Sequence, residues 1–589
     1  MTQLIHKIFL LLCILSCSAS TFAATASEAE YKKLSKSWTL NADGSQEFRY
    51  NMELTIYTYT AMRSMYGESF ITYNPKYQTL KINSSYTKQK DGSIVKTPDN
   101  AFVEVLPSSA VNAPYYNKLT EMVIVHTGLE LGATIYLDYT LTTKAGYLPE
   151  LDIMEPIEQS SPVKEYNISI SVPEGDDLFY GIHNRNEKAK VSVNNGKLQA
   201  SWSLKNLPAA SRAPYQRSDN SFLMATTYPS QKEAVKAIYA KMETKESMPL
   251  LSLAETVTAG KNCDEEKVQA ILSFVHNDFA HSALSLEETG YMIRPVEDVI
   301  NSAYGTETEL VNLMQGLLNA LKIKAEVCAF YPINNPDNRM GLKPVRFFVK
   351  ADAGNQTWLL NPNTESMDNA GWMADRGFVV EAKSGNSINL PSVNADMKYD
   401  VEMTWKDNKV TSSIKADISR ALINYTDTKA TAFTAGDSKA SVRISGETAH
   451  LEFTCPTTAS TQNGISMVAL PDAPKGMSHS AYIHGNTTRD CNLILPYAAN
   501  ETYSYSVQVP AGKSCITASV EKNISNAAGS IQISIQNTGE KVTVKRSLKL
   551  HSATIAKANY PAFHALLATW VNPNYTMLMF KDKLLVMRY

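Results

Sequence analysis

The sequence predicts a multidomain α+β protein in which an N-terminal β-sandwich and a C-terminal β-sandwich flank a central α+β domain. Three observations carry this prediction. The chain has 589 residues, enough for about three to four domains of roughly 150 residues each. Its first and last thirds alternate apolar and polar residues with a period of two. Its middle third spaces apolar residues as amphipathic helices do.

The N-terminal domain is predicted over residues 26–217. Between Phe48 and Ile56, every second residue is apolar and the residues between are polar, as on a half-buried strand. Lys90-Asp91-Gly92-Ser93 predicts a hairpin turn, because glycine accepts the positive φ that such a turn needs. Another strand is expected from Thr134 to Leu141. Several short strands separated by turns favour a β-sandwich.

The central domain is predicted over residues 229–390. One helix is expected from Ser230 to about Lys245, and a second begins at Asp264. A third has leucines at helical spacing from Leu310 to Leu321. Strands are then expected at Ala325–Tyr331, Val345–Lys350 and Thr357–Leu360. Helices followed by a sheet indicate an α+β domain.

The C-terminal domain is predicted over residues 398–589. Tyr503, Tyr505, Val507 and Val509 alternate with polar residues. Three alternating isoleucines end at Ile535, and the turn Asn537-Thr538-Gly539 leads into another alternating segment. These patterns predict a second β-sandwich.

The first 23 residues are expected to be an export signal. A short polar start ends at Lys7, an apolar segment follows from Ile8 to Leu15, and small residues end near Ala23. Lipid attachment at Cys17 is the alternative processing. No later apolar run is long enough to cross a membrane. The protein is therefore expected in the periplasm or at the cell surface.

The charge and cysteine content of the chain indicate which classes of partner and cofactor to expect. The net charge of −2 argues against nucleic acid, whose binders need a basic surface. Cleavage near Ala23 would leave five widely spaced cysteines, so the sequence contains no zinc signature and is expected to need no metal or cofactor. His276 and His281 flank Asp278, but positions five apart match one helical face poorly. Solvated or capping histidines are favoured over a metal site.

The stretch from Gly290 to Pro332 reads GYMIRPVEDVINSAYGTETELVNLMQGLLNALKIKAEVCAFYP and resembles the transglutaminase-like core, which is related in fold to papain-type cysteine proteases. Tyr304-Gly305, the apolar helix and its exit at Lys322–Ala325 match that family, as does TWLLNPN from Thr357 to Asn363. The flanks, including KQKDGSIV and LPYAANETYSYSVQVPAG, resemble β domains that precede and follow such cores in exported bacterial proteins. The resemblance covers most of the mature chain.

The resemblance implies where a catalytic triad would stand. The cysteine position falls on Glu307, the histidine position on Arg346 with one residue of uncertainty toward Phe347, and the aspartate position on Asn361. Glutamate cannot form a thioester, and arginine stays protonated near neutral pH. Cys263 and Cys328 are expected on other elements, neither at a helix start. The implied triad is therefore degenerate.

Two interpretations of position 307 remain. In the first, Thr306 and Glu309 form a capping box, so the position became a structural helix start. In the second, Glu307 and Arg346 pair across the former cleft and bind a polar ligand.

Aromatic residues near this position could line a groove or belong to the core. The candidate cleft-lining residues are Tyr304, Thr306 and Trp358, with Trp372 and Tyr291 as further aromatic candidates. The expected function is a non-catalytic binding or assembly module for a peptide, glycan or protein partner. The alternative is an amide-processing enzyme with rearranged residues, in which Glu307 and Glu309 would do acid–base work.

Overall fold

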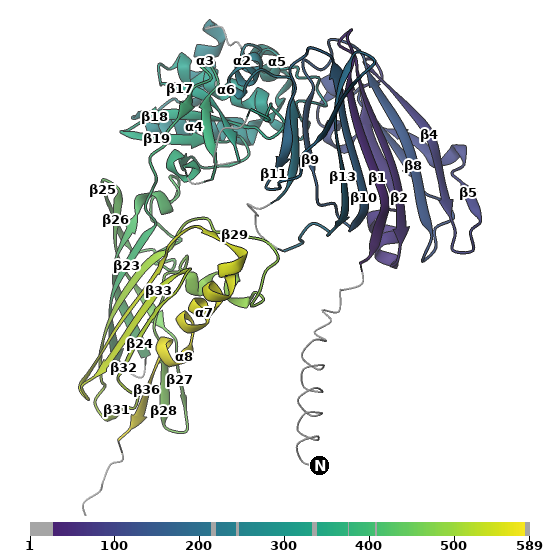
Figure 1. The fold of residues 1–589 in the computed structure, drawn as a ribbon. Helices are drawn as coiled ribbons and strands as arrows, with labels where there is room; N and C mark the ends of the chain where they lie inside the picture. Colours follow the sequence, from purple (N-terminus) through teal and green to yellow (C-terminus); the bar gives the residue numbers. More distant parts are fainter. Residues whose placement is uncertain are drawn as a thin grey trace, which may run out of the picture. The chain divides into compact units, whose positions relative to one another are not determined.

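The computed structural model describes residues 27–213, 220–242, 247–332, 338–374, 376–406 and 409–583 (Figure 1). The predicted export signal and Cys17 lie outside these residues. The chain forms two compact units. Among the described residues, the first unit holds 27–151, Glu155–Ala210 and Ser221–Leu223. The second unit holds the other described residues, so the central and C-terminal regions cluster together.

The first unit is built on an eight-stranded sheet with the order β12-β13-β10-β1-β2-β8-β4-β5. Its strands are β1 (Ala29–Leu40), β2 (Gln46–Ile56), β4 (Gln78–Lys88), β5 (Ile94–Lys96), β8 (Thr134–Thr143), β10 (Val163–Pro173), β12 (Lys190–Asn194) and β13 (Lys197–Leu207). The predicted strand around Phe48–Ile56 is β2, and the predicted hairpin turn joins β4 to β5 with Gly92 at φ +92°.

A smaller sheet of the first unit has the order β3-β7-β6 and comprises β3 (Glu68–Tyr73), β6 (Phe102–Val105) and β7 (Thr120–Val125). Its inner face carries Ile71, Tyr73 and Ile124, which are buried. A third sheet, β11-β14-β9, is formed by β9 (Asp152–Pro156), β11 (Phe179–His183) and β14 (Phe222–Thr226).

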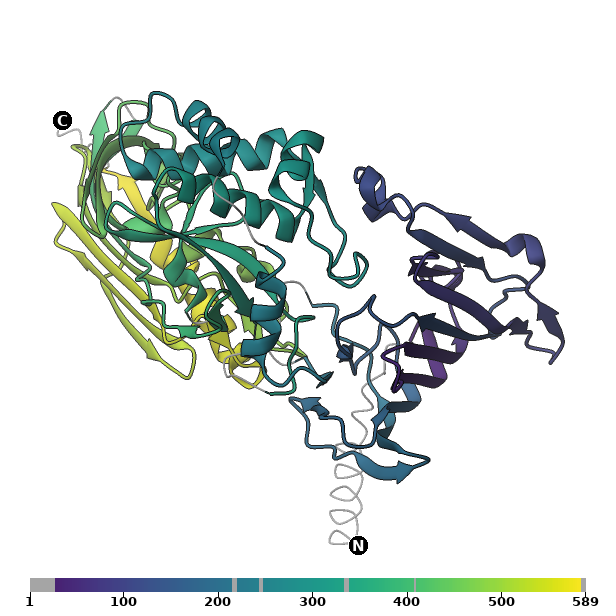
Figure 2. The same ribbon diagram turned by 90° about the horizontal axis from the view of Figure 1, so that it is seen from above.

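The central region carries helices and a six-stranded sheet, as predicted. The helices, drawn in teal in Figure 2, are α2 (Gln231–Tyr239), α3 (Met248–Val257), α4 (Asp264–Asp278), α5 (Val296–Ser302) and α6 (Glu307–Ala320). The sheet has the order β20-β19-β18-β17-β21-β22, with β17 (Ala325–Tyr331), β18 (Arg346–Ala353), β19 (Gln356–Leu360), β20 (Asp368–Asn369), β21 (Phe378–Glu381) and β22 (Ser387–Ile388).

Helix α6 is the centre of this region. It packs on β17 and β18 and contacts α3, α4 and α5. Its residues from Thr308 to Leu318 are all buried, so the helix is enclosed on every side. Two short parallel strands, β15 (Ala280–Ser282) and β16 (Tyr304–Thr306), lead into it, with His281 opposite Gly305.

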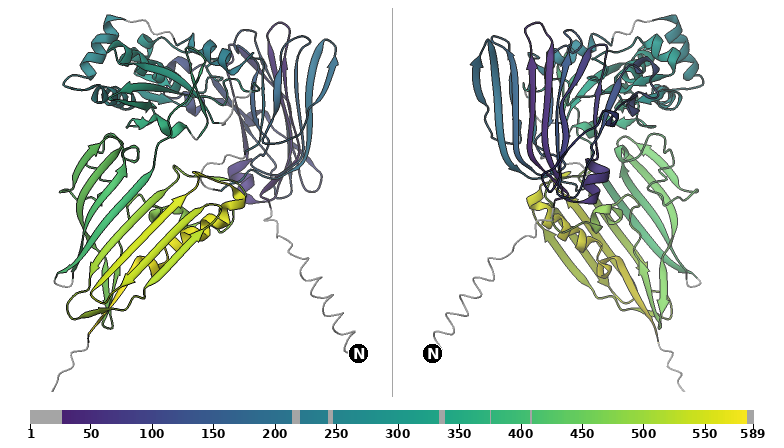
Figure 3. Two further views of the ribbon diagram at one scale, coloured as in Figure 1. Left: turned by 60° about the vertical axis from the view of Figure 1, so that its left-hand side comes forward. Right: turned by 90° about the vertical axis from the view of Figure 1, so that its right-hand side faces the viewer.

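The C-terminal region is built on a second eight-stranded sheet, β25-β26-β24-β23-β30-β34-β33-β32, whose long strands are visible in Figure 3. These are β23 (Asp396–Lys406), β24 (Lys409–Ser419), β25 (Ser441–Ser445), β26 (Thr448–Thr457), β30 (Asn500–Gln508), β32 (Val520–Ser525), β33 (Gly529–Asn537) and β34 (Lys541–Leu550). A four-stranded sheet, β27-β28-β36-β31, comprises β27 (Ala459–Gln462), β28 (Ile465–Ala469), β31 (Lys513–Cys515) and β36 (Met577–Asp582). A two-stranded sheet pairs β29 (Leu493–Ile494) with β35 (Thr554–Ile555).

The C-terminal region also contains a helix that the sequence prediction of a β domain did not include. Helix α7 (Tyr560–Trp570) buries Phe563, Leu566, Leu567 and Trp570 in the same core as the strands and contacts β33. A short helix, α8 (Pro573–Thr576), follows it. Within the described residues, no helix combines the length and apolar character that a membrane crossing requires.

The fold class predicted from the sequence is confirmed: β-sheet domains at both ends and a helical and sheet region between them. The predicted helix at Asp264 is α4, and the predicted strand Ala325–Tyr331 is β17. Helices α3 and α5 were not predicted.

Candidate functional site

The start of α6 is fixed by a capping box, as the sequence predicted. Thr306 is the N-cap, and its Oγ1 accepts a hydrogen bond from the amide of Glu309 at 3.3 Å. The amide of Thr306 donates to Glu309 Oε2 at 2.9 Å. Gly305 is needed just before, because a β-carbon there would lie 2.9 Å from Leu310 Cδ2. The glycine of the Tyr304-Gly305-Thr306 turn therefore has a packing reason that is independent of catalysis.

Glu309 is also the acceptor of a buried ion pair that the sequence analysis did not find. Arg294 donates from Nε to Glu309 Oε1 at 3.0 Å and from Nη2 to Oε2 at 2.9 Å, and the Arg294 amide donates to Oε1 as well. The same guanidinium donates to the carbonyl of Tyr304 at 2.7 Å and lies 4.1 Å from the centre of the Tyr304 ring. Both charged side chains are buried. The Glu309 carboxylate thus accepts four hydrogen bonds, three from Arg294 and one from the Thr306 amide, and has a structural role at the helix start.

Glu307, at the position implied for the nucleophile, meets Arg346, at the position implied for the base. Arg346 Nη1 lies 3.6 Å from Glu307 Oε2, and β18 begins at Arg346. The Arg346 side chain is 73% exposed and that of Glu307 is 28% exposed. Burial raises the pKa of the Glu307 carboxyl, and the positive charge of Arg346 opposes this rise. Glu307 and Arg346 therefore form the ion pair of the second interpretation, and the arginine side chain is largely exposed to solvent.

Asn361, at the implied aspartate position, turns toward its own segment. Its Oδ1 accepts a hydrogen bond from the amide of Asn363 at 2.9 Å, which stabilises the turn after β19. Within the described residues, no hydrogen bond joins Asn361 to Glu307 or Arg346. The structure therefore brings together two of the three implied positions and leaves the third in a local turn.

Two histidines lie against the segment that follows Asn361. His276 Nδ1 is 2.8 Å from the carbonyl oxygen of Pro362, and His281 Nδ1 is 3.1 Å from Asn363 Oδ1. Their ring centres are 5.7 Å apart in an edge-to-face arrangement. His281 Nε2 is buried and has no hydrogen-bond partner in the described part of the chain. Sequence spacing gave no sign of this cluster, because Pro362 and Asn363 approach it from more than 80 residues away.

No metal site emerges around these histidines: the described residues contain no group of three or more histidine, cysteine, aspartate or glutamate ligands that could hold an ion. In the described ranges, neither imidazole forms a hydrogen bond to a cysteine sulfur. The His281 imidazole lies beside the segment that leads into α6, because His281 pairs with Gly305.

The structure corrects the expectation for one of the two cysteines, Cys263. Cys263 was expected away from a helix start, but it is the N-cap of α4, because its backbone is extended and the helix begins at Asp264. Its thiol is free and exposed. Three carboxylates, Asp264, Glu265 and Glu266, occupy the first turn after it. Cys328 lies on β17, where burial raises the pKa of its thiol to about 12. Neither cysteine belongs to α6.

The residues predicted to line a cleft are packed against protein. Tyr304, Thr306 and Trp358 are all buried. Tyr304 lies under the Arg294 guanidinium, and Thr306 caps α6. Trp358 donates from Nε1 to the carbonyl of Ala353 at 3.1 Å and contacts Tyr425 edge-to-face. In this structure each of the three side chains contributes to packing.

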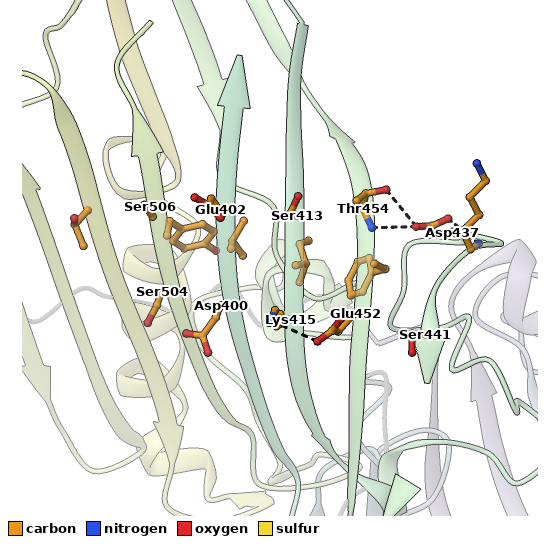
Figure 4. Close-up of a pocket in the computed structure, with 16 residues that line it drawn as sticks. Asp400, Glu402, Ser413, Lys415, Asp437, Ser441, Glu452, Thr454, Ser504 and Ser506 are labelled. Carbon is orange, nitrogen blue, oxygen red and sulfur yellow. Dashed lines mark hydrogen bonds and ion pairs between the residues drawn. The ribbon is translucent and has the colours of Figure 1, made fainter. Parts of the chain in front are cut away.

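A hollow that includes charged and hydroxyl side chains lies elsewhere, on the outer face of the eight-stranded C-terminal sheet. It has a volume of about 820 Å³ and is shown in Figure 4. Glu402 stands between Ser413 on β24 and Ser506 on β30, and Lys415 lies 3.5 Å from Glu452. The hollow offers hydroxyl, carboxylate and ammonium groups, which suit a polar ligand.

Comparison with known proteins places these observations in context. Residues 42–211 match the domain of unknown function DUF3857, and residues 466–580 match the domain of unknown function DUF3858. A crystal structure from Parabacteroides distasonis, described as that of a "putative protease", is 35% identical. The match covers 94% of this chain and 99% of that chain, with a TM-score of 0.72.

A second structure, described as a "putative cysteine protease" from Cytophaga hutchinsonii, is 14% identical over 40% of this chain and 89% of that chain. Its TM-score of 0.18 is too low to support a shared arrangement. None of the curated proteins matches this chain.

Proposed function

This chain belongs to the family of the Parabacteroides distasonis protein, and from that premise we propose that its central domain is a transglutaminase-like core that binds or assembles rather than catalyses. The observation that carries the proposal is the ion pair between Glu307 and Arg346. It occupies the two positions at which the resemblance requires a thiolate and an imidazole.

The chemistry of this pair supports loss of acyl transfer. A carboxylate at a helix N-terminus is stabilised by the helix dipole, and this arrangement suits a cap better than a nucleophile. Arg346 carries a permanent charge and cannot take a proton from an attacking group. Asn361 is engaged with the amide of Asn363 and orients no base in the described residues.

The competing function is an amide-processing enzyme with rearranged residues, which the description of the Parabacteroides distasonis structure favours. Its simplest form would use Glu307 and Glu309 as an acid–base pair. The contacts of Glu309 argue against this form, because Arg294 and the Thr306 amide occupy both of its oxygens. Only the Glu307 carboxylate would remain for proton transfer.

A peptidase and cross-linking assay on the purified full chain tests the proposal. We expect no release of amine from peptide substrates and no incorporation of an amine donor, before and after alkylation of the exposed Cys263 thiol. Turnover that disappears in Glu307→Gln, or in Cys263→Ser, would establish the competing function. The variant Glu255→Gln, which changes an exposed carboxyl on α3, is the matched control.

The proposed ligand is a peptide, glycan or protein partner, and the proposed location is the periplasm or cell surface. The hollow beside Glu402 supports a polar ligand, because it presents short hydroxyl side chains next to a carboxylate. Cell fractionation tests the location. Labelling with a lipid precursor, compared between the natural chain and Cys17→Ala, distinguishes lipid attachment from simple cleavage.

A further inference from the structure

The small sheet β3-β7-β6 of the first unit has an unusually apolar outer face. Phe70, Val123 and Val103 lie side by side across its three strands, because Phe70 pairs with Val123 and Val103 pairs with the same residue. Phe70 is 58% exposed and Val103 is 43% exposed. Val105 and Val125 extend the row on the same face, since side chains two residues apart on a strand share a face. These five residues are called the β6 face below.

The neighbouring eight-stranded sheet shows what a solvated face of this unit looks like. The corresponding positions on its central strands carry Ser35 and Ser37 on β1, Arg49 and Asn51 on β2, and Ser169 on β10. An antiparallel sheet that faces water normally alternates in this way, with polar residues outward. The β6 face departs from that pattern, and contiguous exposed apolar residues mark interaction surfaces.

The strand order shows what kind of partner this face can take. Strand β6 is an edge: among the described residues it pairs with β7 alone. Every second backbone N–H and C=O group of an edge strand points away from its neighbour and is available to another strand. An extended segment added beside β6 would gain these hydrogen bonds and would continue the apolar row.

The charges on the same face select the composition of that segment. The two ionisable residues that point outward from these strands are Glu68 on β3 and Glu121 on β7. Glu121 is on the outer face, since Thr72 Oγ1 donates to its Oε2 at 3.4 Å. An apolar row with a carboxylate at each end complements a segment whose basic residues share a face with its apolar residues, which on a strand means a spacing of two.

We propose that the β6 face is a docking site for an extended segment of a partner protein, which joins the sheet as a strand beside β6. Its valine-like or larger apolar side chains lie next to Val103 and Val105, and a lysine or arginine reaches Glu121. A second copy of this chain fits less well, because the face carries no basic residue to meet the glutamates of its twin. The docking site does not depend on whether Glu307 catalyses.

A peptide titration tests this site with the full-length protein. The probe is a fluorescent seven-residue peptide with lysine at its first and last positions, valine at positions three and five, and threonine between them, so that lysine and valine share one face of the strand. The matched probe has glutamate in place of lysine. We expect the lysine peptide to bind at least tenfold more tightly than the glutamate peptide. Val103→Lys with Val105→Lys should weaken binding of the lysine peptide at least tenfold, and Glu121→Gln should weaken it severalfold.

The control places the same pair of valine-to-lysine substitutions on a different edge strand, β12. Val191 and Val193 lie on the edge strand β12 and are each 50% exposed, so Val191→Lys with Val193→Lys changes charge and exposure equally. Binding that is unaffected by the β6 substitutions, or that falls equally in the β12 variant, would overturn the proposal.

Hydrogen exchange gives a readout specific to strand addition. The amides of Phe102–Val105 should gain protection when the lysine peptide binds, and unchanged exchange there would also overturn the proposal. Light scattering after gel filtration completes the test. We expect a monomer; a dimer that dissociates in the Val103→Lys, Val105→Lys variant would identify a second copy as the occupant and refute the partner-segment assignment.

Discussion

Arg294 and Glu309 form a buried bidentate ion pair at the start of α6, two residues beyond Glu307. This pair joins the loop before α5 to the first turn of the central helix. By contrast, the pair between Glu307 and Arg346 is open to solvent on the arginine side. The helix start is therefore stabilised by a carboxylate that is fully buried.

The two arginines should differ greatly in their effect on stability. Arg294→Ala leaves the buried Glu309 carboxylate without its partner, which we expect to lower the free energy of unfolding by about 3–5 kcal/mol. Arg346→Ala removes an exposed pair and should cost no more than about 1 kcal/mol. Urea denaturation of both variants at pH 7 checks the difference. Equal losses would mean that the burial of Arg294 does not govern its contribution.

The hydroxyl of Thr306 should contribute measurably through the cap of α6. Thr306→Ala removes the acceptor for the Glu309 amide and should destabilise the chain by about 1 kcal/mol. Thr306→Ser keeps the oxygen and serves as the matched control. If the serine variant lost as much stability as the alanine variant, the methyl group of Thr306 and not its hydrogen bond would be responsible.

Local patterns in the sequence were sufficient to predict much of the central region. The capping box depends on residues three apart, and α4 and α6 have apolar residues at helical spacing, so both could be located without tertiary information. Helix α5 spans only seven residues and is too short for periodicity to identify. A helix that begins at Asp264 makes Cys263 its N-cap, so the sequence alone was sufficient to place Cys263 at a helix start.

The remaining features depend on contacts between distant segments. Arg294 reaches Glu309 across α5, and His281 meets Asn363 across four strands, so no local pattern could pair them. Helix α7 is different, because Phe563, Leu566, Leu567 and Trp570 have the spacing i, i+3, i+4 and i+7. This signal was present in the sequence but was hidden by the alternating strands on its N-terminal side.

A cysteine introduced at position 307 should report the electrostatics at the start of α6. In Glu307→Cys, combined with Cys263→Ser to remove the exposed thiol, we expect the pKa of the new thiol to fall below the free value of about 8.5. The α6 N-terminus and the Arg346 charge both favour thiolate. The rate of iodoacetamide alkylation as a function of pH measures this pKa.

The Glu307→Cys, Cys263→Ser variant also separates the effect of Arg346 on the thiol pKa from the effect of the helix N-terminus. Adding Arg346→Ala should raise the thiol pKa part of the way back toward 8.5. The part of the pKa decrease that persists without Arg346 measures the effect of the helix N-terminus. A thiol pKa at or above 8.5 with Arg346 present would show that burial at position 307 outweighs both positive influences. Peptide hydrolysis should stay absent, because Arg346 still stands where an imidazole is needed.

Glu501, on the inner face of β30, predicts a pH dependence of folding. Its carboxyl is fully buried and accepts hydrogen bonds from the Met477 amide and the Tyr503 hydroxyl, at 2.7 and 2.8 Å. Burial raises its pKa from 4.5 to about 7. The folded state therefore keeps a proton that the unfolded state releases at lower pH. Between these two values, the free energy of unfolding falls as the pH rises, and above about pH 7 this contribution is constant.

Glu501→Gln should remove that slope, because an amide fills the same space without ionising. At about 1.4 kcal/mol per pH unit, the natural chain loses up to about 3 kcal/mol between pH 4.5 and pH 8 through this group. The natural chain should therefore lose stability relative to Glu501→Gln as the pH rises through this range. Urea denaturation of both proteins at several pH values measures the difference in their unfolding free energies. Glu402→Gln changes an exposed carboxyl on the opposite face of the same sheet and should leave the profile unaltered. A constant difference for Glu501→Gln would show that Glu501 ionises alike in the folded and unfolded states.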